Sequence, residues 1–333
     1  MTIQAPQYTL NEYKDRSTWL VVFGIIEIII GALFIFSSLS NLMLLTGISD
    51  TQGLDTPSSS LIISFLFTIA IAALFITLGI GSIKAKRWAR TLTYITSWLW
   101  LLIGIIGFIF AVIIAPGLME QIAESSEFED IPEGFLDFIT YLTLAFIAIF
   151  YVVLPALFVW FYGNKNVVAT CERKDPKENW TDRCPQNILA ISLAFTVSAF
   201  AVLSAGTYGW TVPFFGIILS GGVGAAVVIV SSLFLGYTAL GLYKLDVKAW
   251  WYAVVLTFAW SISFIITYPR YSLSDFYEKM NLSTEQIEVI DNISVLDGPI
   301  IVIITGLVGI LFIGYMFRIK KQFQTGTVQE YAE

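Results

Sequence analysis

Histidine is absent from this chain of 333 residues, and only 13% of its residues are charged. Because imidazole is the commonest metal ligand and a frequent general base, its absence removes the usual route to metal-assisted or acid–base catalysis. The apolar segments hold no paired acids, and the chain has neither a metal-ligating quartet nor a glycine-rich loop followed by lysine for a nucleotide. We therefore expect no enzymatic activity, no metal site and no bound cofactor.

Hydrophobic residues are abundant instead, at 57% of the chain, against ~45–50% in soluble domains. A helix needs about 20 apolar residues to cross a hydrocarbon core of roughly 30 Å. The segments that meet or approach this length are 18–40, 61–83, 92–115, 138–162, 187–208, 218–243, 249–268 and 298–318. The composition predicts an all-α polytopic membrane protein with eight transmembrane helices in a lipid bilayer. No small-residue cleavage pattern follows the first segment, so we expect it to be retained.

Charge is distributed unevenly between the two sides of such a bundle. Of the 18 Lys and Arg residues, only Arg270 and Lys279 fall on one side. The positive-inside rule makes the other, basic side cytoplasmic, so we expect both termini there (N-in, C-in). Most carboxylates lie opposite, notably at 120–137 and 275–297, and this acidic outer face argues against nucleic-acid binding. The short loops fit a multi-pass protein of the plasma (inner) membrane.

The two halves of the chain resemble each other. The stretch GSIKAKRWARTLTYITSWLWLLIGII from Gly81 overlays GLYKLDVKAWWYAVVLTFAWSISFII from Gly241, and the same shift carries the later spans onto one another. Since each half has an even number of helices, we expect two parallel four-helix repeats rather than inverted ones. Any two helical hairpins with a Gly–Lys turn would also look alike, and this alternative stays open. The expected regions are a first repeat at 1–162, a cytoplasmic linker at 163–186, a second repeat at 187–321 and a cytoplasmic tail at 322–333.

A single carboxylate, Glu27, interrupts the apolar stretch VVFGIIEIIIGALF at 21–34. It lies about 14 Å beyond Thr18 along a helix, close to the bilayer centre. An acid there costs about 2.5–3.5 kcal/mol, so we expect it to face the bundle interior and find a partner. Gly31, one turn later on the same face, would let a neighbouring helix approach closely. Two interpretations are open: a proton or cation relay, and a protonated structural carboxyl bonded to a Ser, Thr or carbonyl oxygen of another helix.

The two cysteines, Cys171 and Cys184, lie in the predicted cytoplasmic linker. Two thiols without histidine do not supply the four N or S ligands of a tetrahedral zinc site, and a disulfide is disfavoured in a reducing cytosol. We therefore expect ordinary thiols in an ordered linker. A redox switch, or a metal bridge between two protomers, stays an open alternative.

Two basic turns, KAKRWAR at 84–90 and KLDVKAWW at 244–251, place Lys and Arg beside Trp where predicted helices leave the membrane. This pattern is typical of topology signals and aromatic belts, and it also suits contacts with anionic lipid headgroups at the cytoplasmic face. The candidate headgroup contacts are Lys84, Lys86, Arg87, Trp88, Arg90, Lys244, Lys248, Trp250 and Trp251.

Two functional classes remain. One is a membrane scaffold or accessory subunit that acts through helix packing and an acidic extracytoplasmic face, with another membrane protein or a second copy of the chain as partner. The other is a small-solute or cation transporter or channel that uses Glu27 as an intramembrane relay. Because a polar permeant needs a polar path, and the spans hold one acid with scattered Ser and Thr, the sequence favours the first class.

Overall fold

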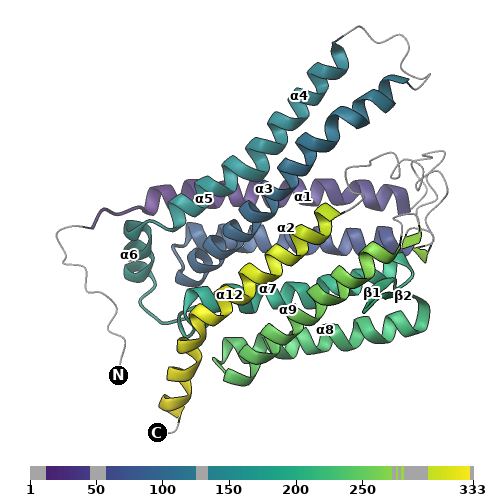
Figure 1. Ribbon diagram of the computed structural model, residues 1–333. Helices are drawn as coiled ribbons and strands as arrows, with labels where there is room; N and C mark the ends of the chain where they lie inside the picture. Colours follow the sequence, from purple (N-terminus) through teal and green to yellow (C-terminus); the bar gives the residue numbers. More distant parts are fainter. Residues whose placement is uncertain are drawn as a thin grey trace. The chain divides into compact units, whose positions relative to one another are not determined.

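The computed structural model describes residues 13–45, 58–124, 134–271, 275–276, 279–280 and 299–330. Within these ranges, eight helical segments are long and apolar enough to cross a membrane (Figure 1), as the composition predicts. The chain divides into two compact units, Met1–Gln186 and Asn187–Glu333. The protein is therefore a multi-pass, helical membrane protein.

The first unit contains α1 (Ser17–Leu45), α2 (Ser58–Ile83), α3 (Arg87–Glu124), α4 (Phe135–Ala148), α5 (Leu154–Tyr162) and α6 (Lys165–Lys174). A π-helical turn, Ile149–Val153, joins α4 to α5, so the predicted span at 138–162 is one continuous helix. Pro155 lies two residues after Val153, the last residue of this turn, and its missing N–H cannot bond the carbonyl of Tyr151 four residues earlier. That carbonyl packs against Gly104 of α3, where a side chain would collide with it. The turn thus resolves the break that proline introduces.

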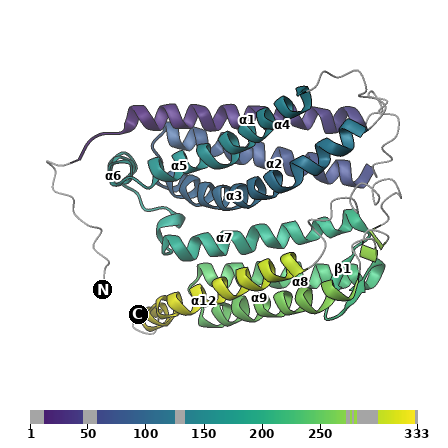
Figure 2. The same cartoon turned by 45° about the horizontal axis from the view of Figure 1, so that its top comes forward.

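Helices α1 and α2 run side by side at backbone contact (Figure 2). A Cβ atom at Gly24 would lie 2.7 Å from the carbonyl oxygen of Gly79, and one at Gly31 would lie 2.9 Å from that of Ala72. Small residues permit this approach, and van der Waals contact then replaces a hydrophobic driving force that lipid does not supply. Glu27 of α1 lies within this close α1–α2 contact.

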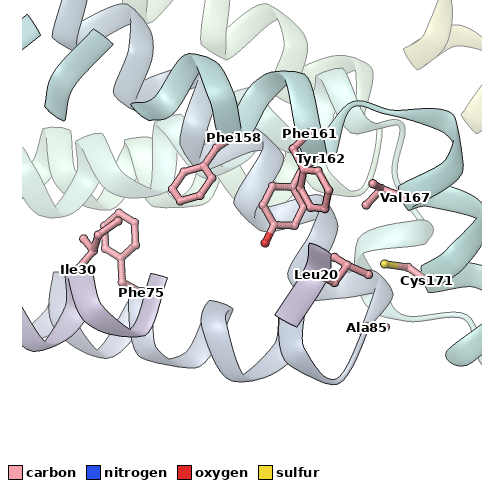
Figure 3. Close-up of a cluster of buried hydrophobic side chains, with 9 residues drawn as sticks. All are labelled: Leu20, Ile30, Phe75, Ala85, Phe158, Phe161, Tyr162, Val167 and Cys171. Atoms are coloured by element: carbon pink, nitrogen blue, oxygen red, sulfur yellow. The ribbon is translucent and has the colours of Figure 1, made fainter. Parts of the chain in front are cut away.

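The core of the first unit is aromatic (Figure 3). Phe23 of α1 stacks on Phe161 of α5 with ring centroids 4.0 Å apart, while Phe75 of α2 meets Trp100 of α3 edge to face at 5.4 Å. Offset and edge-to-face pairs of this kind are favourable beyond the area they bury. The core cluster comprises Leu20, Ile30, Phe75, Ala85, Phe158, Phe161, Tyr162, Val167 and Cys171.

The predicted linker is ordered and belongs to the first unit. Its helix α6 begins after Asn164, whose side chain accepts a hydrogen bond from the backbone N–H of Asn166, as an N-cap does. The segment that precedes α1 packs on α6, because the N–H of Arg16 donates to the Thr170 hydroxyl at 3.1 Å. Helix α6 therefore covers the end of the unit at which α1 begins and α5 ends (Figure 1).

The second unit contains α7 (Gln186–Ala201), β1 (Val212–Phe214), β2 (Ile217–Leu219), α8 (Gly221–Tyr243), α9 (Val247–Thr267) and α12 (Pro299–Glu330). The predicted span at 187–208 ends as a tight 3-10 segment over Val202–Tyr208. Helix α12 continues beyond the predicted span at 298–318 and through most of the predicted tail. These differences concern helix ends, where pattern-based boundaries are least reliable.

An antiparallel hairpin replaces the start of the span predicted at 218–243. Phe215 and Gly216 form its turn with φ of 43° and 94°, the left-handed pair that two-residue hairpins favour. The N–H groups of these two residues donate to the hydroxyls of Ser263 and Thr267 on α9, at 2.9 and 2.8 Å. The hairpin is thus fixed by side chains far along the sequence, which an apolar run does not reveal.

The α2–α3 and α8–α9 turns have the same backbone form. Each contains a non-glycine residue in the left-handed region, Ala85 with φ of 50° and Leu245 with φ of 59°, a conformation that costs roughly 1–2 kcal/mol. The equivalent hydrogen bonds are Lys86 N–H to Gly81 O and Asp246 N–H to Gly241 O, both 2.9 Å. In both turns the glycine lies against an alanine of the following helix, Ala89 or Ala249.

Candidate functional site

Glu27 is fully buried in the first unit, with an exposed fraction of 0%. Its Cβ lies opposite Gly79, where an added Cβ would be 3.1 Å away. Gly79 is four residues, or about 6 Å, from the last residue of α2. Ile83, the last residue of α2, lies beside Gly24 of α1. The acid is therefore nearer to the basic α2–α3 turn than its distance from the start of α1 indicates.

Three hydroxyl groups face the Glu27 carboxyl, from Ser82 of α2, Thr93 of α3 and Tyr162 of α5. Tyr162 points its hydroxyl away from α5 and toward α2 (Figure 3), where it donates to the Ser82 hydroxyl at 2.9 Å. Ser82, Thr93 and Tyr162 are 1%, 3% and 0% exposed, respectively. Four helical segments therefore bring one carboxyl and three hydroxyls to one buried place.

The carboxyl is not anchored by regular hydrogen bonds. The three hydroxyls lie within hydrogen-bonding reach of the carboxyl, yet neither of its oxygens makes a hydrogen bond of regular geometry to a described residue, and the same holds for the Thr93 hydroxyl. Buried polar groups are nearly always hydrogen-bonded, so a buried carboxyl without a regular bond is a candidate ligand-binding group. The sequence-based expectation of a Ser or Thr near Glu27 describes the surroundings but not a formed bond.

Arg90 closes the cluster toward α6. Its Nε donates to the carbonyl oxygen of Tyr162 at 2.9 Å, and its guanidinium lies 5.6 Å from the Tyr94 ring centroid. A cation at the last carbonyls of a helix is favourable because these carry partial negative charge. Arg90 is thus turned to α5, not to Glu27, and it is engaged within the protein.

Asp175 of the linker binds the α2–α3 turn. Its carboxylate accepts hydrogen bonds from Lys86 Nζ at 3.2 Å, from the N–H of Arg87 at 3.3 Å and from Asn179 at 3.2 Å. The guanidinium of Arg87 also pairs with Asp182 at 3.2 Å. Burial alone would raise the pKa of Asp175, but these hydrogen bonds outweigh it and hold the pKa below its usual value.

Some of the candidate headgroup residues are exposed in the structure, and others are buried. Lys84, Lys244 and Lys248 are exposed, so these three side chains can reach lipid headgroups. Trp251 is 45% exposed, but its ring contacts Phe317 within the second unit. Trp250 is fully buried. Its indole N–H donates to the carbonyl of Met316 at 2.8 Å, which places it in the core of the second unit instead.

The remaining members of the first basic turn have partners within the unit. Lys86, Arg87 and Arg90 are the residues bonded to the linker and to α5, as described above, and Trp88 packs its ring on Gly81. In the second unit, the ammonium of Lys320 lies 4.8 Å from the ring centroids of both Trp250 and Trp251. These cation–π contacts join α12 to the start of α9.

Cys171 and Cys184 are both free thiols and both buried. Burial raises the pKa of the Cys171 thiol to about 12 and that of Cys184 to about 11. Reactive cysteines need an accessible thiolate, and these surroundings disfavour it. In the described ranges, no group of three or more Cys, Asp or Glu residues is arranged to hold a metal ion.

Sequence reasoning singled out Glu27 and Gly31 but missed Ser82, Thr93 and Tyr162. The three are separated from Glu27 by more than fifty residues each, and no spacing rule connects them. The one available signal is that each lies close to the basic end of its own predicted span. Chemically, a carboxyl beside three hydroxyls can hold a proton or a small cation. No protein-family model, no curated protein and no solved structure matches the chain.

Proposed function

We propose that this multi-pass membrane protein is a transporter or channel for a small cation or a cation-coupled small solute, with Glu27 as its intramembrane binding group. One observation carries the proposal: a fully buried carboxyl lies within reach of three hydroxyls, but its two oxygens make no hydrogen bond of regular geometry to a described residue. A polar residue kept only for packing would be expected to be bonded, because an unpaired group inside a helical bundle costs free energy. An ionisable residue within a membrane span is by default a candidate for an ion pathway.

The sequence favours a scaffold or accessory subunit, and this second function depends on an acidic extracytoplasmic face. Most of the acids concerned, such as those at 127–133 and 285–297, lie outside the described residues. The described geometry therefore gives that function no specific support. It becomes the better explanation if the purified protein moves no ions. Both functions are non-enzymatic.

Flux through the reconstituted full-length chain tests the proposal. Sealed proteoliposomes would hold a pH-sensitive dye, with a potassium diffusion potential to drive proton movement and parallel runs in sodium and in choline buffers. We expect wild type to change the internal pH, either in both buffers or only in sodium. Glu27→Gln should lose that activity. Ser192→Ala is the matched control, since this buried hydroxyl bonds Ala239 O in the second unit. Equal flux in wild type and Glu27→Gln would remove Glu27 from the pathway.

We also propose that the chain is a parallel duplication with both termini in the cytoplasm and that it resides in the plasma membrane. The support is the common form of the α2–α3 and α8–α9 turns, which recur at the spacing that the sequence repeat predicts. An experimental structure should superpose 61–162 on 221–320 by a near two-fold rotation along the membrane normal. An inverted relation between these two ranges would refute the duplication.

A further inference from the structure

The oxygen groups around Glu27 form a built site. One carboxylate and three hydroxyls come from α1, α2, α3 and α5, and every contributing residue is at most 3% exposed. Oxygen-only ligand sets are typical of hard cations, whereas thiolate and imidazole sets select softer metals. The Thr93 hydroxyl and both carboxyl oxygens make no hydrogen bond of regular geometry to a described residue, so their lone pairs can turn to a ligand.

Charge limits what this site can bind. Its single carboxylate carries one negative charge when ionised, and a buried, uncompensated charge is strongly unfavourable. The guanidinium of Arg90 does not supply compensation, because it bonds the Tyr162 carbonyl and faces the Tyr94 ring. One positive charge neutralises the site, whereas a divalent ion would leave a net positive charge and ordinarily binds through several carboxylates.

The other titratable groups around the site are few. Tyr162 of α5 is the titratable side chain that interacts with Glu27, while α2 and α3 contribute the neutral hydroxyls of Ser82 and Thr93. Beyond Tyr162 lie Arg90 of α3 and Cys171 of α6, which interact with each other. A proton that enters or leaves the site is therefore carried by the Glu27 carboxyl.

We propose that Glu27, Ser82, Thr93 and Tyr162 bind one monovalent alkali-metal cation, and that a proton on Glu27 competes with it. In the cation-bound state the carboxylate and the hydroxyl lone pairs ligate the ion. In the proton-bound state the neutral carboxyl remains beside the same hydroxyls. This inference deepens the proposed function and rests on it for its role in transport, but the binding itself can be measured without transport.

Thermal unfolding of the purified full-length chain in detergent tests the binding. Wild type would be melted in lithium, sodium, potassium or choline chloride at equal ionic strength, at about pH 8.5 and about pH 5.5. A ligand that binds the folded state raises Tm in proportion to RT ln(1 + [L]/Kd). We expect at least one alkali cation to raise Tm over choline at the higher pH, and a much smaller rise at the lower pH.

Variants then assign the effect to the site. Glu27→Gln should abolish the alkali-dependent rise. Thr93→Val and Tyr162→Phe should each weaken the apparent affinity about tenfold, as the loss of one polar contact to a charge typically does. Ser192→Ala should leave the affinity unchanged. A variant that does not fold leaves the wild-type competition between pH and cation as the deciding measurement.

Several results would overturn the inference. These are a wild-type Tm that does not distinguish alkali cations from choline, a rise that persists in Glu27→Gln, a rise that is independent of pH, or an effect confined to divalent ions. Failure of the proposed function looks different. In that case the alkali cation still raises Tm through Glu27, but the proteoliposomes show no flux.

Discussion

At the residue scale, two substitutions of Glu27 separate the effect of its side-chain volume from the effect of its ionisable carboxyl. Glu27→Gln keeps the volume and can use the Ser82 and Thr93 hydroxyls as partners, so its Tm in choline should be close to that of wild type. Glu27→Ala opens a void and leaves those hydroxyls facing apolar space, at a cost on the order of 1–4 kcal/mol. Detergent melts of both variants check this order.

The same pair of variants also distinguishes structure from transport. We expect Glu27→Gln to retain stability but lose flux, because an amide does not release a proton near neutral pH and carries no negative charge. If the Tm of Glu27→Ala equals that of wild type, the cluster around Glu27 is not packed as described. If Gln retains full flux, the carboxyl has a structural role only.

Cys171 and Cys184 provide a prediction about reactivity. A pKa of about 12 for Cys171 and about 11 for Cys184 leaves little thiolate at pH 8, and the thiolate is the nucleophile. We expect negligible labelling of the folded protein by N-ethylmaleimide and full labelling after unfolding in detergent. Lys177→Cys, at an exposed position of the same linker, should label rapidly and is the control. Labelling of the native thiols at the rate of position 177 would restore the redox interpretation.

At the scale of elements, α3 and α9 both begin with a backbone N–H bonded to an aspartate, but the accepting aspartate comes from a different part of the chain in each. The first N–H groups of a helix need acceptors. In α9 this is Asp246, directly before the helix, which accepts from the N–H of Lys248. In α3 the equivalent position is Lys86, which cannot accept, and the linker residue Asp175 accepts from the N–H of Arg87 instead. The linker thus completes the first helical hairpin.

Asp175→Ala tests this contact. The loss of a capping carboxylate costs about 1 kcal/mol, and we expect faster hydrogen exchange in the first turn of α3. Because the hydrogen bonds lower the pKa of Asp175 in the folded state, its contribution is present above the unfolded value of about 3.9 and is lost as pH falls through the folded value. The difference in Tm between wild type and variant should therefore shrink below about pH 4.

A matched variant in the second unit is the control for Asp175. Asp246→Ala should cost a similar amount but act on the first turn of α9 and leave exchange in α3 unchanged. A difference between wild type and Asp175→Ala that stays constant down to pH 3, or that leaves α3 exchange unaffected, would contradict the capping role.

At the scale of the whole molecule, the spans were predictable and the contacts between them were not. In lipid every backbone polar group must be bonded within its segment, so an apolar run of about 20 residues has few alternatives to a helix. The approach of Ser82, Thr93 and Tyr162 to Glu27, and of Asp175 to Lys86, depends on packing between segments far apart in the sequence. The same holds for the hairpin at 212–219, whose second strand reaches into the span predicted at 218–243 and whose turn is held by Ser263 and Thr267 of α9.

Membrane topology remains a prediction that the charge distribution makes and labelling can check. Ser125→Cys and Glu285→Cys should react with an impermeant maleimide in intact cells, and Lys177→Cys only after permeabilisation. The physical reason is that Lys and Arg near span ends resist translocation. Labelling of position 177 from outside would reverse the assigned orientation.

The capping of α3 by Asp175 has a consequence for how the protein is made. The acceptor lies 88 residues after Arg87, whereas Asp246 lies two residues before the N–H that it caps. During synthesis α9 can therefore complete its first turn as soon as it leaves the ribosome. Helix α3 must wait until α4, α5 and the linker have followed it, and it can reach its final form only after the first four spans have been inserted.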